Sequence, residues 1–274
     1  KKLIYDSGKN WQSITNFGPL RYGFDKERKS QNSYNQTLKY IDVMVTIASR
    51  TTSINGFGRS RYNDHFYAYL FPEFANETGD NNQSVLRNLV SGNHGSNSGI
   101  GFENSWFIFQ ISRGKENWGA GNDIQLSLSK YSSSYDYFLL GSDYGKIRVR
   151  YIHGFLEKVE NVNRYITARA LEYTNKKSLV IGLSETVIYS GENRSFDIGY
   201  LNPVSSHLEI ELNNRLNIVG DGNSNAVWQF HLDLLPFKNF RFSFNFLYDE
   251  FVLDPDIQIG KENGKAFSSR LAYS

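Results

Sequence analysis

The sequence predicts an all-β protein, an antiparallel β-barrel that crosses a membrane with its strands. Aromatic and polar residues alternate most strictly between Trp228 and Phe251. The 274-residue chain is rich in aromatic residues that favour strands, with 20 Phe, 18 Tyr and 4 Trp. No run approaches the roughly 20 apolar residues of a membrane helix, whereas a barrel strand needs only half of its residues apolar.

The stretch 228–251 predicts a hairpin with about ten residues a side. Its apolar positions alternate, at Trp228, Phe230, Leu232 and Leu234 and again at Phe240, Phe242, Phe244, Phe246 and Tyr248. The other face carries charged and titratable side chains that we expect to line a lumen: His231, Asp233, Arg241 and Asp249. A soluble β-sandwich also alternates, and it remains the alternative at this point.

Composition excludes several other classes. The 30 basic and 28 acidic residues give a net charge of +2 with no basic run, so nothing indicates nucleic-acid binding. The absence of Cys removes disulfides, thiolate metal sites and Cys nucleophiles. The chain begins at Lys1 without a signal peptide, and we expect one barrel domain over 1–274 that is incomplete at both ends.

The N-terminal third contains the weakest strand signals. Residues 1–35 are irregular, 37–48 predict a strand, and 65–71 predict one more. The rest of 51–101 is polar and rich in Gly, with a short helical candidate at 84–90, which predicts a loop outside the barrel or folded into its lumen. His94 has no second ligand nearby, so we expect a solvated histidine and no metal site.

Two strands with a glycine turn between them are expected at 106–113 and 124–129. The turn, 114–122, contains Lys115, Trp118 and three glycines. No GKS or GKT follows and the next element is a strand, so we reject nucleotide binding here.

Further strands are predicted at 135–140, 144–155, 163–173 and 178–189. In the second of these, Arg148 and Arg150 share one face, which we expect to line the lumen. Such a stripe would favour anionic solutes, or it could pair internally with acidic residues of the barrel, and both interpretations stay open.

Connection lengths decide how to interpret 202–216. Bacterial barrels alternate short periplasmic turns with long external loops. A membrane-crossing strand at 206–218 would put the tight 236–239 turn outside, which conflicts with that rule. We therefore predict a helix near 203–215 that does not cross, with Asn202 as N-cap, Pro203 at the first position, and leucines four apart on one face.

With these residues in place, the chain resembles the capsule assembly Wzi family of outer-membrane barrel lectins over roughly 100–255. Residues 107–121, FIFQISRGKENWGAG, resemble the family's strand that ends in Arg before a tryptophan-glycine turn. Ser127 and Ser129 match its LLLS-like strand, 169–184 resembles the pair that ends in IGLS, and 190–194 (SGENR) resembles its glycine-rich loop with an arginine. Ala120 stands where the family has proline, and Glu192 follows a single glycine.

The resemblance implies a barrel of ~18 strands in the outer membrane of a Gram-negative bacterium, retaining capsular or other surface polysaccharide without catalysis. Sugar binding needs accessible aromatic faces beside polar groups. The candidate glycan-binding residues are Lys115, Glu116, Asn117, Trp118, Arg194, Asp197 and Tyr200. Two other roles remain open: Trp118 as an interfacial anchor and Arg194 as a residue that holds its own loop.

Catalysis and cofactors find no support in the sequence. The acidic pairs lie in loops or face different directions, no G-x-S-x-G occurs, and the five His lack H-E-x-x-H spacing. We expect no cofactor, membrane lipid and surface polysaccharide as partners, no nucleic acid, and a monomer. The rival functions are a general porin or solute channel, with Arg148 and Arg150 setting selectivity, and a secreted soluble β protein that acts on carbohydrate.

Overall fold

The computed structural model describes residues 38–47, 51–62, 65–71, 73–77, 97–121, 124–129, 132–212, 223–237, 239–249 and 263–273. These residues form thirteen strands, one 3₁₀ helix and one short α-helix. Their bounds are β1 (Leu38–Ile47), β2 (Thr51–Tyr62), β3 (Phe66–Phe71), β4 (Glu73–Glu77), β5 (Asn97–Glu103), β6 (Phe107–Gly114), β7 (Tyr135–Asp143), β8 (Ile147–Val159), β9 (Val162–Thr174), β10 (Leu179–Glu192), η2 (Ile198–Leu201), α4 (His207–Leu212), β11 (Asn223–Phe237), β12 (Phe240–Asp249) and β13 (Gly264–Tyr273).

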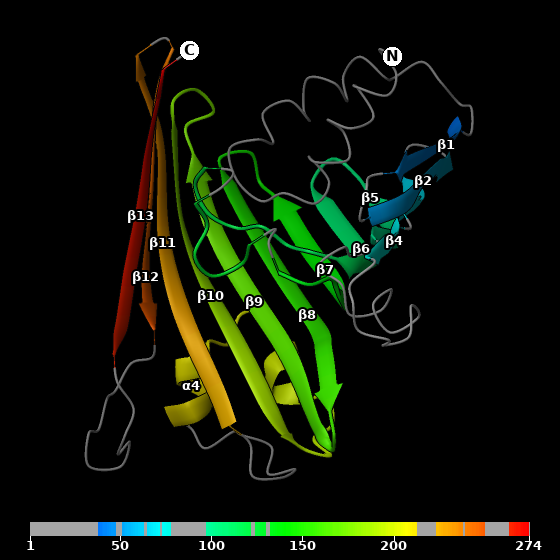
Figure 1. Ribbon diagram of the computed structural model, residues 1–274. Coiled ribbons are helices and arrows are strands. Elements are labelled where there is room, and N and C mark those ends of the chain that lie inside the picture. Colours follow the sequence, from blue (N-terminus) through cyan, green and yellow to red (C-terminus); the bar gives the residue numbers. More distant parts are fainter. Residues whose placement is uncertain are drawn as a thin grey trace.

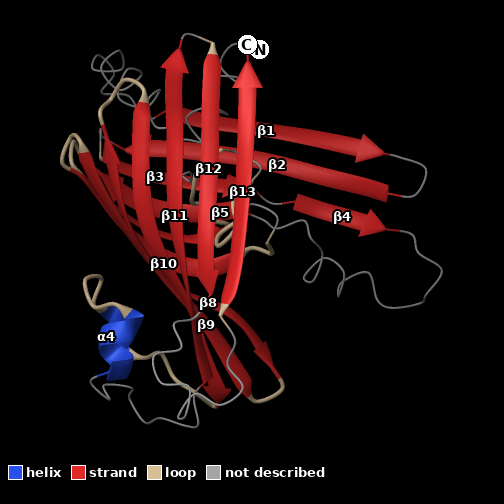
Figure 2. Cartoon of the chain, turned by 90° about the vertical axis from the view of Figure 1, so that its left-hand side faces the viewer, coloured by secondary structure: helices blue, strands red, loops and turns tan. Residues whose placement is uncertain are grey.

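All thirteen strands belong to one antiparallel sheet in which strands that are neighbours in sequence pair side by side, except β4, which pairs with β2. The sheet curves from β1 and β2 on one side to β13 on the other (Figure 1). From the side, β11, β12 and β13 run together while β1, β2 and β4 run across them (Figure 2). Within the described residues, β1 pairs only with β2 and β13 only with β12, so no pairing there closes the sheet.

The register separates two faces of opposite character. One row across β9 to β13 contains Leu171, Leu183, Phe230, Phe246 and Phe267. The adjacent row contains Glu172, Gly182, His231, Asn245 and Ser268. We call the first face outward and the second inward, because residues 115–121 and 124–129 fold back against the second. The alternation seen in the sequence is therefore an alternation between the two sides of a single sheet.

The predicted hairpin at 228–251 is confirmed. β11 and β12 pair from Phe237–Phe240 down to Val227–Asp249, with a tight reversal between them. The outward residues of β12, from Phe240 to Tyr248, are half-buried or exposed, and no second sheet stacks on them among the described residues. The sandwich alternative does not fit this arrangement.

The helix near 203–215 is confirmed in kind but not in its start. The α-helix α4 begins at His207, and Ser206 caps it, accepting a hydrogen bond from the Glu209 amide at 3.1 Å. Asn202 accepts from Val204 N in the preceding turn and is not the helix cap. Because the segment does not form a strand, β10 and β11 lie next to each other, as the connection lengths required.

Two predictions about strands are wrong. Residues 124–129 form no strand beyond a single bridge between Trp118 and Leu128, because inward side chains of the sheet contact this backbone in place of a neighbouring strand. The region 51–101, expected to be mainly a loop, contains β2, β3, β4 and β5. The expectations for 1–35, the helical candidate at 84–90 and His94 lie outside the described residues.

Candidate functional site

Residues 115–121 and 124–129, the crossing segment, leave the end of β6 and cross the inward face toward β12 and β13. Glu116, near the start of this segment, is buried and accepts hydrogen bonds from Trp118 Nε1 at 2.8 Å and Tyr137 Oη at 2.8 Å. Arg150 Nη1 lies 3.6 Å from the same carboxylate. A carboxylate that is buried this deeply is stabilised only by such donors, so Glu116 fixes the segment's first turn on β7 and β8.

Two amide side chains hold the rest of the crossing segment. On β12, Asn245 Oδ1 accepts from Ala120 N at 2.8 Å, and its Nδ2 donates to Ala120 O at 3.0 Å and Ile124 O at 3.2 Å. Ser268 on β13 also donates to Ile124 O, at 2.5 Å. The side chain of Asn245 therefore satisfies backbone groups that would otherwise need a strand partner or water.

On β11, Gln229 makes the equivalent contacts on the other half of the segment. Its Nε2 donates to Trp118 O at 3.1 Å, and its Oε1 accepts from Ser127 N at 3.0 Å. Between the two amides lies Gly119, whose φ of +123° and close approach to Gln229 and Asn245 leave no room for a side chain. The crossing segment therefore lies in direct contact with the wall.

The inward wall carries a row of paired charges. Arg148 Nε lies 3.1 Å from Asp143 and its Nη1 lies 3.7 Å from Glu172. Glu172 also lies 3.1 Å from His231 Nε2, across the glycine position of β10. These residues occupy one hydrogen-bonded row of the sheet, so the contacts follow from the register.

The six residues expected to face a lumen all lie on the inward face by register: Arg148, Arg150, His231, Asp233, Arg241 and Asp249. Arg241 pairs with Asp233, which is fully buried, while Asp249 lies half-exposed at the end of β12. Of the two interpretations of the arginine pair, internal pairing is the one that the contacts of Arg148 and Arg150 fit.

Residues 193–210, the covering segment, pack on the opposite, outward face. Arg194 donates to Ser190 O at 3.1 Å and to Asp197 Oδ2 at 3.2 Å, and its guanidinium lies over the Tyr189 ring at 4.7 Å. Tyr165 Oη donates to Arg194 O at 3.0 Å. Arg194 therefore holds its own loop against β9 and β10.

Tyr200 completes that attachment. Its ring stacks on Tyr189 with centroids 4.7 Å apart, its hydroxyl lies 2.9 Å from His207 Nδ1, and its carbonyl accepts from Tyr151 at 2.7 Å. Asp197 caps the short η2 helix by accepting from Gly199 N at 2.8 Å. The covering segment thus combines a stacked aromatic column with hydrogen bonds.

The candidate glycan residues do not have the access that sugar contact requires. Glu116, Asn117, Trp118, Arg194, Asp197 and Tyr200 are buried, and only Lys115 is partly exposed. The two groups also lie on opposite faces of the sheet. Their burial corrects the expectation of open aromatic and polar surfaces, and their contacts are those of residues that attach long connections to the wall.

Sequence reasoning missed the two amides, Gln229 and Asn245, and a polar patch on the outward face. The patch comprises Tyr151, His153, Thr167, Arg169 and Glu185. They occupy outward positions on β8, β9 and β10, and the outward residues of these strands nearer the short turns are mainly apolar. Alternation marked which side each residue faces, but nothing in the sequence signalled what would cover it. The available signals were the charged residues Arg169 and Glu185, each at an outward position among apolar or aromatic residues of its own strand.

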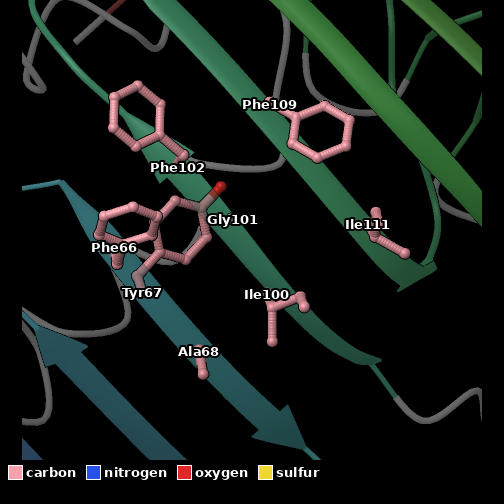
Figure 3. A pocket seen from close by; sticks show the side chains of 8 residues that line it. All are labelled: Phe66, Tyr67, Ala68, Ile100, Gly101, Phe102, Phe109 and Ile111. Atoms are coloured by element: carbon pink, nitrogen blue, oxygen red, sulfur yellow. The ribbon is translucent and has the colours of Figure 1, made fainter.

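No helix in the described part of the chain is long and apolar enough to span a membrane. In the same residues no group of three or more metal-ligating side chains comes together. Two hollows lie on the outward face, one of about 570 Å³ at the edge of the covering segment and one of about 350 Å³ between β3, β5 and β6. The second is lined almost entirely by apolar side chains (Figure 3).

No protein-family description and no curated protein matches the chain. Two solved structures of OmpT, an outer membrane protein of Vibrio cholerae, align at 10% identity. The alignment with the form that lacks loop L8 covers 97% of that chain and 87% of this chain, with a TM-score of 0.34. The alignment with the form folded in vitro covers 85% of that chain and 78% of this chain, with a TM-score of 0.30. Likeness at this level carries no argument about this chain.

Proposed function

We propose that this chain is part of a non-catalytic outer-membrane β-barrel, without a cofactor and acting as a monomer. The observation that carries the proposal is the outward face, where large apolar side chains are exposed on strand after strand. They include Phe66, Ile100, Ile111, Ile147, Leu171, Leu183, Phe246, Phe267 and Leu271. Soluble proteins rarely expose so continuous an apolar face, which argues against the secreted soluble alternative.

The lengths of the connections also support a transmembrane barrel. At one end of the sheet the connections are short, at 63–65, 104–106, 144–146, 175–178 and 238–239. At the other end four connections are long, at 78–96, 115–134, 193–222 and 250–263, and two are short, at 48–50 and 160–161. Outer-membrane barrels have this asymmetry, with short turns in the periplasm and long loops outside.

Aromatic side chains gather at the short-turn end. They are Trp106, Tyr144, Tyr173 and Phe237, each exposed and each in or next to a turn, and Tyr273, which is exposed and pairs with Phe240 at the same end of the sheet. Such rings favour the boundary between lipid and water, where an apolar ring and a polar edge are both satisfied. They fit one of the two aromatic girdles of a transmembrane barrel.

Within that frame we propose that the barrel retains capsular or other surface polysaccharide, as its resemblance to the Wzi family implies. The crossing segment supports a barrel with an obstructed lumen, because its contacts run from β7 to β13 across the inward face. Since the candidate glycan residues are buried, the glycan would meet the long-connection end through other residues. Lys115 is the one candidate that keeps an exposed portion.

A solute channel is the second candidate, favoured by the charged inward wall. Paired arginines and carboxylates at Arg148, Glu172, Asp233 and Arg241 would line any passage left beside the crossing segment. Rings of charged side chains of this kind set ion preference in pores.

Planar-bilayer conductance combined with polysaccharide pull-down separates these functions. The retention proposal predicts a folded protein with no stable open pore that captures acidic capsular polysaccharide on beads. A matched bead carrying a neutral glucan controls for nonspecific capture. A stable open pore without capture would support the channel in its place, and a protein that is monodisperse without detergent would overturn the membrane barrel itself.

A further inference from the structure

The larger outward hollow is a groove of about 570 Å³ that spans β6 to β11. This is the size of pockets that hold small ligands. Its walls are mainly apolar side chains of the outward face and of the covering segment: Phe107, Leu140, Val149, Leu171, Leu183 and Val204.

Polar groups lie at one end of the groove. Arg169 Nε is 3.3 Å from Glu185 Oε2, and the other oxygen of Glu185 accepts from His207 N at 2.9 Å. Arg169 Nη1 and Nη2 are buried and have no hydrogen-bond acceptor among the described residues. A buried donor without an acceptor is costly, so an acceptor that enters the groove would be stabilised there.

The chemistry of that acceptor follows from the charge. Arg169 and Glu185 neutralise each other, so the site offers N–H donors without a net positive charge. An uncharged oxygen, such as an ester or amide carbonyl, fits such donors better than a free anion. The apolar walls require the rest of the ligand to be a hydrocarbon chain.

The groove also has a direction. Pro203, Val204 and Ser206 of the covering segment border it on the side of the long connections. Toward the short turns it continues into Leu171 and Leu183, which are 53% and 54% exposed on the outward face. In the proposed membrane orientation the long connections lie outside the cell, so a carbonyl at Arg169 and a tail along the wall match a lipid of the outer leaflet.

We propose that this groove binds an acyl chain of an outer-leaflet lipid, whose ester or amide carbonyl accepts hydrogen bonds from Arg169. This inference rests on the proposed membrane barrel. The smaller hollow provides an internal contrast: Phe66, Ile100, Phe102 and Ile111 form its walls with no charged side chain among its lining residues (Figure 3). Nothing there would hold one lipid in place of another.

The test is lipid retention by the full chain, purified from outer membranes in mild detergent and analysed by native mass spectrometry with lipid A as the added probe. Leu183→Trp fills the groove from its exposed rim, and Leu271→Trp makes the same change on β13, away from it. We expect Leu183→Trp to reduce retained lipid A about tenfold, which corresponds to about 1.4 kcal/mol, and Leu271→Trp to leave it unchanged.

A second variant, Arg169→Gln with Glu185→Gln, removes the guanidinium without leaving a lone buried carboxylate. It should reduce retention as Leu183→Trp does. Retention that stays at the wild-type level in both variants, or that is absent from the wild type, overturns the groove. Membrane insertion is measured separately by flotation with liposomes. Variants that float normally still form the membrane barrel. A wild-type protein that does not float would overturn both the proposed membrane barrel and the lipid-binding groove.

Discussion

The crossing segment and the covering segment are two long connections that fold back on opposite faces of the same sheet. The crossing segment is held by a buried carboxylate and two amides, and its Trp118 and Leu128 are buried in an apolar cluster with Leu139 and Ile152 of the inward face. The covering segment meets Tyr151 and Glu185 of the sheet through hydrogen bonds and stacks Phe196 on His153, but it exposes Ile198 and Val204. The crossing segment thus buries its apolar side chains against the sheet, whereas the covering segment leaves apolar side chains exposed, as expected if the outward face meets an apolar phase as proposed.

The largest effect is expected from removing the buried carboxylate that attaches the crossing segment to the sheet. Glu116→Leu leaves Arg150 beside an apolar side chain and removes the acceptor for Trp118 and Tyr137. Breaking a buried pair from one side destabilises a protein by about 3–5 kcal/mol. We expect a loss of that size in the free energy of unfolding measured in urea.

The matched control for Glu116→Leu is Glu157→Gln, since Glu157 pairs with Arg164 at the surface. Exposed pairs contribute about 0–1 kcal/mol, so this variant should unfold almost as the wild type does. Equal losses in the two variants would show that the Glu116 carboxylate does not attach the crossing segment to the sheet.

A smaller effect separates the crossing segment from the wall without removing a charge. Asn245→Ala leaves Ala120 N without its acceptor and removes one donor each from Ala120 O and Ile124 O, and a buried group left without a partner costs about 1–3 kcal/mol. We expect the segment to loosen and transient conductance to appear in planar bilayers. Ser269→Ala, on the outward face of β13, should stay closed, and a closed Asn245→Ala protein would contradict a role of this amide in closure.

The third prediction tests whether the attachment of the covering segment is independent of that of the crossing segment. Arg194→Met removes hydrogen bonds of a charged side chain to Ser190 and Asp197, each worth about 1.5–3 kcal/mol. Hydrogen exchange should rise over 193–210 while conductance stays as in the wild type. A simultaneous rise over 115–129 would mean that the two segments are coupled through the sheet.

The smallest effect is expected at Tyr200, where two variants separate the contribution of ring stacking from that of the hydroxyl group. Tyr200→Phe keeps the ring stacked on Tyr189 but removes the hydroxyl beside His207, which should cost about 1 kcal/mol. Tyr200→Leu removes the stacking as well and should cost more in the same urea titration. If the two variants are equally destabilised, stacking contributes nothing to the attachment.

The sequence predicted the parts of the fold that depend on alternation. The hairpin at 228–251 and the side on which Arg148, His231 and Asp233 lie follow from period-two patterning, which survives without knowledge of the partners. Parity of the connections also identified the helix that does not cross, because one extra strand would have inverted every later turn.

Alternation did not predict which long connection packs on which face. Residues 124–129 alternate like a strand, yet the amides of Gln229 and Asn245, more than 100 positions away, take up their backbone groups. Arg194 and Tyr200 have the composition of a sugar site, but they contact Tyr189 of β10 and Tyr151 of β8 instead. Such contacts are set by tertiary packing, and a local pattern does not record them.

The most direct test of the account is lipid contact on adjacent residues of β13, where Phe267 faces outward and Ala266 inward. The chain has no native cysteine, so Phe267→Cys and Ala266→Cys each give one labelling site. With a bimane label in liposomes of brominated lipid, the account predicts strong quenching at position 267 and little at 266. Equal quenching at both positions, or none at 267, would contradict an outward face that meets lipid.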